Sequence, residues 1–217
     1  MAEEIEKSPK KILGICGSPR KNRSCDFLVE EALKGAKETD ETIEIEKIYL
    51  VDYKLEQCTG CDQCLREPYE CPLSENDDFK KLEEKILSAD AIFIAAPCYF
   101  GSVSGLTKVF IDRSRPWKMA NYKLKDIIFA PMGASGLRNG GAAGVVSDLI
   151  NFAFIQGMVC FGALGNPVID ENIPMTSLQK YGRKEFIKKG EIDEIGQRVA
   201  KNIGVRAVNL LLKMKKK

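Results

Sequence analysis

The sequence predicts an α/β protein in which a doubly wound, five-stranded parallel sheet is covered by helices on both faces. Short, continuously apolar segments, typical of buried parallel strands, alternate with longer segments whose apolar residues recur at helical spacing. Three of the apolar segments run directly into loops that contain glycine and serine. Five β–α units in alternation imply right-handed crossovers and therefore a parallel sheet.

The predicted strands are short apolar segments that end at turn residues. They comprise residues 11–16, 42–50, 91–96, 126–132 and 158–161. The second strand alternates imperfectly, whereas the third is apolar throughout, as expected of a central strand. Helices are predicted between successive strands and after the last one. Apolar residues expected to face inward in these helices include Leu28, Leu33, Phe79, Leu82, Ile86, Leu106, Phe110, Ile192, Ile195, Val199, Ile203 and Leu210.

One helix start carries a specific signal. Ser74 and Asp77 have the Ser-x-x-Asp spacing of a capping motif, so we expect them to open the helix that contains Phe79.

We expect the flavodoxin-like strand order 2-1-3-4-5. Its switch point lies between the first and third strands, where ligands bind at the carboxyl ends of the strands. Loops 17–24 and 97–104 flank that position, and loop 133–141 lies next to it. The convergence of three loops predicts a phosphate-containing ligand in this crevice.

The first loop has features of a phosphate site. Strand, polar loop and helix present backbone N–H groups at a helix N-terminus, and Arg20 can add a forked contact to phosphate. The loop lacks the Gly-Lys-Ser/Thr ending of a Walker A loop and the Gly-x-Gly-x-x-Gly pattern of dinucleotide sites, so it suits a single terminal phosphate. Taken alone, it could equally be a polar turn capped by serine.

Four of the eight cysteines lie within 14 residues, at Cys58, Cys61, Cys64 and Cys71. Cys-x2-Cys-x2-Cys followed by Cys-Pro is typical of thiolates that hold an iron–sulfur cluster. Six residues before the last cysteine give the chain room to fold back, so that all four could bind one [4Fe–4S] cube. A structural zinc site or a Cys-x2-Cys redox pair are the alternatives. Two others, Cys16 and Cys160, lie in apolar strands and are expected to be core residues.

Composition excludes several kinds of chemistry. The chain has 217 residues, a net charge of +2 and no histidine, so Ser-His or Cys-His catalysis and histidine-ligated metals are excluded. Its near-neutral charge gives no argument for nucleic acid or membrane partners, and no apolar segment approaches the roughly 20 residues of a membrane span. Eight cysteines without an export signal suggest a cytoplasmic protein. Chemistry carried by bound cofactors fits this composition best.

The loop Gly-Ser-Pro-Arg and the segment Pro-x-Tyr-Phe-Gly-Ser-Val-Ser resemble the NADPH-dependent FMN reductase-like flavoproteins, over about residues 11–165. The compact cysteine motif is similar to that of the archaeal and anaerobic-bacterial iron–sulfur flavoproteins.

The resemblance implies FMN and a [4Fe–4S] cluster as cofactors. It implies that the FMN phosphate binds at Ser18, Arg20, Asn22, Ser24 and Cys25. It implies that the second loop wraps the flavin through Pro97, Tyr99, Phe100 and Gly101. It implies that Gly133 and Ala134 approach the isoalloxazine, and that the four clustered cysteines are the iron ligands.

The resemblance also implies a homodimer or homotetramer that takes electrons from a ferredoxin-like donor, with NAD(P)H as a further possible donor. We expect one FMN-binding domain over residues 1–217, with an iron–sulfur loop at 54–75 and a C-terminal arm and helix at 166–217. The irregular segment 166–190 is long for a simple connection and is expected to cross to a neighbouring subunit. Two other functions stay open: an NAD(P)H-dependent flavin or quinone reductase with a zinc-stabilised loop, and a non-catalytic electron carrier.

Overall fold

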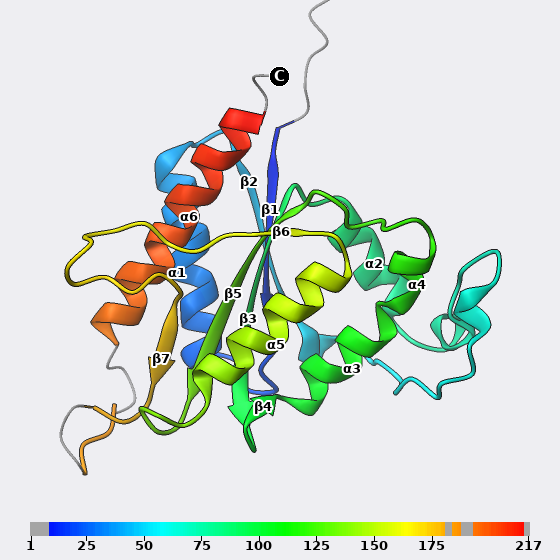
Figure 1. Ribbon diagram of the computed structural model, residues 1–217, viewed down its shortest axis with the longest axis horizontal. Coiled ribbons are helices and arrows are strands. Elements are labelled where there is room, and N and C mark those ends of the chain that lie inside the picture. Colours follow the sequence, from blue (N-terminus) through cyan, green and yellow to red (C-terminus); the bar gives the residue numbers. More distant parts are fainter. Residues whose placement is uncertain (1–8, 181–183, 188–192, 215–217) are drawn as a thin grey trace, which may run out of the picture.

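The computed structural model describes residues 9–180, 184–187 and 193–214. A twisted parallel sheet runs through the middle of the molecule, with helices on either side (Figure 1). The parallel strands are β1 (Lys11–Cys16), β2 (Glu44–Tyr49), β3 (Ala91–Tyr99), β5 (Ile128–Ser135) and β6 (Val159–Cys160). Their order is β2-β1-β3-β5-β6, which confirms the predicted flavodoxin-like order.

Two short strands were not predicted. Strand β4 (Ser102–Val103) pairs antiparallel with the end of β3, so the second loop is a small hairpin. Strand β7 (Met175–Ser177) pairs parallel with the carboxyl end of β5, while β6 pairs only with its beginning. Part of the segment 166–190 therefore extends the sheet of its own chain.

The helices follow the predicted alternation. The helices that cover the sheet are α1 (Ser24–Thr39), α2 (Phe79–Leu87), α3 (Gly105–Arg113), α4 (Arg115–Met119), α5 (Ala142–Ile155) and α6 (Glu194–Met214). Three short 3-10 turns, η1 (Leu50–Asp52), η2 (Gln63–Leu65) and η3 (Pro72–Glu75), lie between β2 and α2. Ile192, which was expected on the inner face of the last helix, lies outside the described residues.

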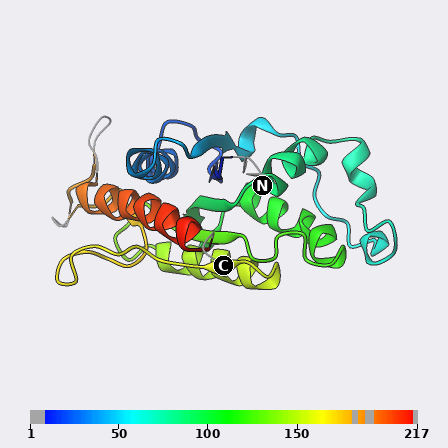
Figure 2. The same ribbon diagram turned by 90° about the horizontal axis from the view of Figure 1, so that it is seen from above.

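Successive side chains along each strand point to opposite faces of the sheet, so the core forms two layers, one on each face. Ile12 and Phe93 face α1 and α6, whereas Leu13 and Phe129 face the helices α2 to α5. Both layers are closely filled by apolar side chains, which is why the central strands read as continuously apolar. Seen from above, α1 and α6 lie at one end of the molecule and the cysteine-rich loop at the other (Figure 2).

Helices α1 and α6 approach each other closely. A Cβ placed on Gly204 would lie 1.9 Å from the carbonyl oxygen of Ala32, and one on Gly35 would lie 2.2 Å from that of Lys201. Backbone atoms cannot move aside easily, so glycine at both positions allows the contact. The last helix is therefore packed on the first, as its amphipathic pattern predicts.

The capping prediction at Ser74 is wrong. Ser74 lies in η3, and α2 begins at Phe79. Asp77 accepts a hydrogen bond from the backbone N–H of Phe79, at 3.0 Å, while its other oxygen binds groups outside the helix. A tertiary contact therefore uses the residues that the local pattern assigned to a cap. Among the described residues, no helix is long and apolar enough to cross a membrane.

Candidate cofactor sites

The first loop is ordered by its own polar side chains. Ser18 is buried, and its hydroxyl accepts the N–H of Arg20 at 3.1 Å. Asn22 has a left-handed backbone, with φ of 56°, and its N–H donates to Asp26 Oδ2 at 2.8 Å. Helix α1 then begins at Ser24 without a side-chain cap. The first N–H groups of α1 are therefore not capped by a side chain, as a phosphate site at a helix N-terminus requires.

Arg20 and Cys25 lie on the two sides of this helix start. Arg20 is exposed, while Cys25 is buried in the first turn. Burial raises the pKa of the Cys25 thiol well above its ordinary value, although the nearby Arg20 charge acts in the opposite direction. Cys25 is therefore a neutral thiol, and its backbone N–H is the group that could serve an anion.

Asp26 supports the loop and was not singled out in the sequence. Its carboxylate is buried and accepts hydrogen bonds from Lys47 at 2.8 Å and from the Tyr49 hydroxyl at 3.0 Å. Both partners come from β2, so the carboxylate joins the first loop to the neighbouring strand. The signal that could have found it is an acidic residue in the first turn of a helix that otherwise presents an apolar face.

The three predicted ligand loops meet at the carboxyl edge of the sheet. The carbonyl oxygen of Gly17 accepts hydrogen bonds from Ser104 at 2.8 Å and from Thr107 at 3.0 Å, which joins the first loop to the second. A Cβ on Gly141, where φ is 95°, would lie 2.7 Å from Cys98 Sγ, so the third loop also touches the second.

The register of the strands places the remaining loop residues. Pro97 on β3 is paired with Ala134 on β5, and Ala96 is paired with Gly133. A Cβ on Gly133 would lie 2.7 Å from the carbonyl oxygen of Ala142, so this position leaves little room for a side chain. The structure therefore brings the residues predicted in the second and third loops side by side.

Aromatic side chains project from the hairpin at the end of β3. Tyr99 is exposed, and Phe100 is fully exposed with a left-handed backbone, φ 51°. Gly101 follows with φ of 90°. A hairpin that holds two aromatic rings outward beside the crevice can supply a stacking surface for a planar ligand.

The four clustered cysteines line one small hollow. Cys58, Cys61, Cys64 and Cys71 share it with Arg115 of α4. Four cysteine side chains around one hollow are a donor set that suits an iron–sulfur cluster, and a structural zinc ion uses the same donors.

A buried arginine frames the cysteine loop. Arg113 donates to the carbonyl oxygen of Glu56 at 2.8 Å, to Ser74 Oγ at 3.1 Å and to Asp77. Glu56 precedes the first clustered cysteine, and Ser74 follows the last. One side chain therefore holds both ends of the loop against α3, and no local sequence pattern indicates it.

The other cysteines behave as core residues. Cys16 is fully buried, and burial raises the pKa of its thiol to about 11. Cys160 is partly buried, and burial likewise raises its thiol pKa to about 11. Neither thiol is ionised near neutral pH, as expected of small apolar core residues.

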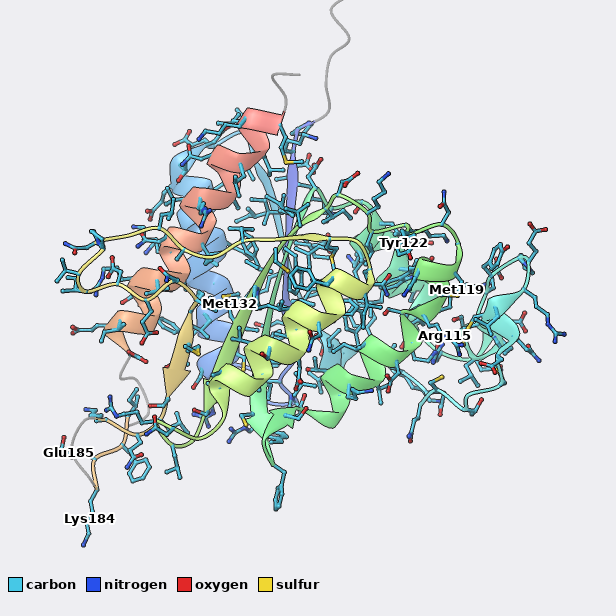
Figure 3. The ribbon with its side chains drawn as sticks, in the orientation of Figure 1. Arg115, Met119, Tyr122, Met132, Lys184 and Glu185 are labelled. Carbon is cyan, nitrogen blue, oxygen red and sulfur yellow. The ribbon has the colours of Figure 1, made fainter. Side chains whose placement is uncertain are left out.

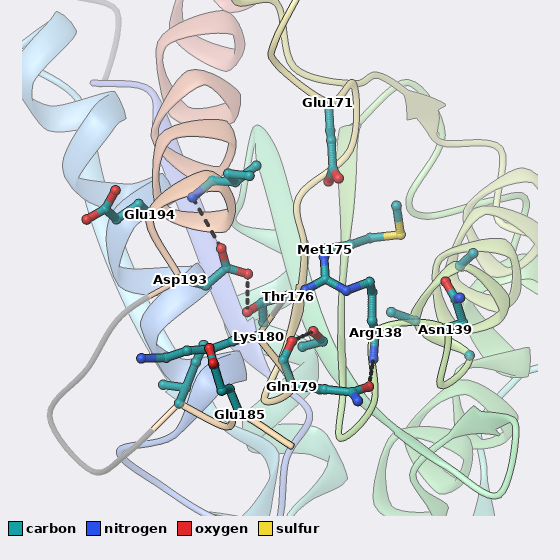
Figure 4. Close-up of a pocket in the computed structure, with 16 residues that line it drawn as sticks. Arg138, Asn139, Glu171, Met175, Thr176, Gln179, Lys180, Glu185, Asp193 and Glu194 are labelled. Atoms are coloured by element: carbon teal, nitrogen blue, oxygen red, sulfur yellow. Dashed lines mark hydrogen bonds between the residues drawn. The ribbon is translucent and has the colours of Figure 1, made fainter. Parts of the chain in front are cut away.

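A second cavity, of about 920 Å³, opens beyond the third loop (Figure 4). It is lined by residues of that loop, of β7 and of the start of α6, including Asn139 and Met175, and by Glu171 from the segment between β6 and β7. Burial raises the pKa of the Glu171 carboxyl, and the charge of Asp193 adds to this. No local sequence pattern indicates this cavity, because β7, the third loop and the start of α6 come together only in the folded chain.

The order of the parallel strands and the helices on both faces define a flavodoxin-like fold. Solved structures of the same fold include a flavodoxin from the domain Archaea, 14% identical, with a TM-score of 0.54 and coverage of 93% of this chain and 99% of that one. The flavoenzyme NAD(P)H:(acceptor) oxidoreductase of Paracoccus denitrificans is 21% identical, with a TM-score of 0.60 and coverage of 94% and 98%.

Relatives found by sequence define the family more narrowly than the shared fold does. The model of the NADPH-dependent FMN reductase family matches residues 10–165. An iron–sulfur flavoprotein of Archaeoglobus fulgidus is 40% identical over 92% of this chain and 94% of its own length. An iron–sulfur flavoprotein of Methanocaldococcus jannaschii is 32% identical over 95% of this chain and 100% of its own length. The chain belongs to the NADPH-dependent FMN reductase family and, within it, to the iron–sulfur flavoproteins, and it is an FMN-dependent oxidoreductase.

Proposed function

We propose that the protein holds one FMN and one [4Fe–4S] cluster, and that electrons pass from a ferredoxin-like donor through the cluster to FMN and on to an acceptor such as oxygen species or a quinone. The observation that carries the proposal is the pair of separate sites in one chain. Three loops meet at the edge of the sheet, and four cysteines share one hollow.

The first loop would hold the FMN phosphate. Its support is the uncapped start of α1 beside Arg20, with Ser18 and Asn22 fixing the backbone of the turn. A phosphate there would receive backbone N–H groups at the positive end of the helix and a charge-assisted contact from the guanidinium.

The second and third loops would hold the flavin ring. Tyr99, Phe100 and Gly101 follow the end of β3, while Gly133 and Ala134 lie at the end of β5 that pairs with it. When bound, FMN would accept one or two electrons and return them to an acceptor. The residues of these two loops would orient the ring and limit access of water to it.

The cysteine hollow would hold the cluster through Cys58, Cys61, Cys64 and Cys71. A [4Fe–4S] cluster exchanges one electron at a time, which matches a one-electron donor. The loop leaves the sheet edge and folds back against α4 (Figure 1), so electrons would reach FMN either within a subunit or across a subunit interface.

The NAD(P)H-dependent reduction of FMN is a second candidate. The family description and the cavity of about 920 Å³ beside the third loop favour it. A hydride donor would reduce FMN directly and would not need the cluster.

The cofactor content is tested by measuring iron, acid-labile sulfide and FMN in protein purified without oxygen. Stopped-flow absorbance of the flavin then tests the route in Cys61→Ser, with Cys160→Ser as a matched control outside the hollow. We expect Cys61→Ser to keep FMN and reduction by a chemical two-electron reductant, but to lose rapid reduction by ferredoxin. Equal rates with ferredoxin in the cluster-free variant and the parent would contradict the proposed route, and rapid reduction of both by NADPH would favour the second candidate.

A further inference from the structure

Arg115 occupies a defined place beside the cysteine hollow. It is the first residue of α4, and it lines the hollow together with all four clustered cysteines. Figure 3 shows Arg115 between α3 and the cysteine loop. Among the described residues that line this hollow, Arg115 is the one that carries a positive charge.

The guanidinium is held by a residue of the cysteine motif itself. Arg115 Nη1 lies 2.7 Å from Asp62 Oδ1, and Asp62 directly follows Cys61. Asp62 has a left-handed backbone, with φ of 60°, at the point where η2 begins. The ion pair is partly exposed, with 39% of the Arg115 side chain and 61% of the Asp62 side chain accessible, so its contribution to stability is small.

The backbone that carries Arg115 is held close to the cysteine loop by its neighbours. Two residues earlier, the fully buried Arg113 ties both ends of the cysteine loop to the end of α3. Helix α4 also packs against η2, which contains Cys64. The start of α4, which carries Arg115, is therefore anchored beside the cysteine loop.

A fixed charge at this place has one clear electrostatic consequence. A cluster with four thiolate ligands is anionic and gains a further negative charge when it is reduced. A nearby positive charge stabilises the reduced form more than the oxidised form, and a negative charge does the opposite, since net charge and solvent exposure set cluster potentials.

We propose that Arg115 raises the reduction potential of the bound cluster, and that Asp62 positions the guanidinium and offsets part of its charge. The inference rests on the proposed function, because it requires a cluster in the cysteine hollow. Arg115 acts here as a positioning and tuning residue, and it makes no bond to iron.

The test is the midpoint potential of the cluster, measured by poised spectroscopic titration of the anaerobically purified protein. We expect Arg115→Gln to lower the one-electron reduction equilibrium constant about tenfold, which is a shift of about 59 mV. Arg115→Lys should keep most of the parent potential, and Asp62→Asn should shift it upward.

Lys118→Gln is the matched control. It removes the same charge from the same short helix, but Lys118 lies over the ring of Tyr122 and does not line the hollow. Its potential should equal that of the parent. An equal shift in Lys118→Gln and Arg115→Gln would overturn the inference, because the effect would then be that of overall charge.

Iron and sulfide contents separate the possible failures. If the parent holds no cluster, the proposed function fails. If the parent and Arg115→Gln hold the same cluster at the same potential, the role of Arg115 is refuted and the proposed function stands. If Arg115→Gln binds no cluster, the Asp62→Asn variant provides the test of the inference. An unchanged midpoint potential of the cluster in Asp62→Asn would then refute it.

Discussion

Arg113 and Asp77 form an ion pair in which neither side chain has exposed area. The same guanidinium binds the Glu56 carbonyl and Ser74 Oγ, and Asp77 also accepts the backbone N–H groups of Glu56 and Phe79. The pair therefore connects the end of α3 with both ends of the cysteine loop. The stability of the protein and the geometry of the proposed cluster site therefore depend on the same contacts.

Replacing Arg113 by Met should destabilise the protein strongly, because it leaves the carboxylate of Asp77 buried without its partner. We expect a loss of about 3–5 kcal/mol in the free energy of unfolding, measured by urea denaturation. The double variant with Asp77→Asn should lose less than the two single variants together. A loss below about 1 kcal/mol in Arg113→Met would show that the pair contributes no more than a surface ion pair.

The same pair predicts a pH dependence. Burial alone would raise the pKa of Asp77, but hydrogen bonds from Arg113 and from two backbone N–H groups hold it below its ordinary value of 3.8. A carboxyl group with a lowered folded-state pKa adds stability above its unfolded pKa and loses it as pH falls through the folded pKa. The stability difference between the parent and Asp77→Asn should therefore be constant from pH 7 to about pH 5 and should shrink below about pH 4. Denaturation series at fixed ionic strength would measure it, and a difference that grows on acidification would contradict this.

Arg20→Ala should weaken FMN binding. A charge-assisted contact is worth about 1.5–3 kcal/mol, so the dissociation constant should rise roughly tenfold to a hundredfold. Fluorescence quenching on titration of FMN into the apo-protein would measure it. Lys21→Ala is the control, since Lys21 is a neighbouring cation already paired with Asp52 at 2.5 Å. Equal affinities of Arg20→Ala and the parent would mean that Arg20 does not touch the phosphate.

The segment after β6 should take part in self-association. Met175–Ser177 pairs with β5 of its own chain, so this part does not cross to a neighbour. Leu164, Val168 and Ile169, however, are 68%, 87% and 61% exposed. Three apolar side chains on one exposed segment are expected at an interface between subunits. Light scattering should report a dimer or tetramer for the parent and smaller particles for Val168→Glu combined with Ile169→Glu. A monomeric parent would refute this.

Much of the fold followed from local patterns. The alternation of five β–α units predicted a parallel, doubly wound sheet of flavodoxin-like order, and the loops that follow its strands predicted the edge at which they meet. Local patterns failed where a residue had a stronger distant partner. Ser74 and Asp77 match a capping motif, but both bind Arg113, 39 and 36 residues away.

The candidate site was predictable to different degrees. The cysteine spacing and the first loop could be found because their residues are close in the chain. Thr107 and Arg115 could not, since each acts on a loop from another element.

The sequence by itself determined the class of the sheet, the positions of the three loops and the four clustered cysteines, because helical and strand periodicity and ligand spacing are local properties. Only the tertiary structure decided which side chains stand beside those loops. Arg115 reaches Asp62 across 53 residues, and α6 packs on α1 through Gly204 and Gly35. Contacts of this kind depend on how buried surfaces fit together in space, and no local pattern in the chain records that fit.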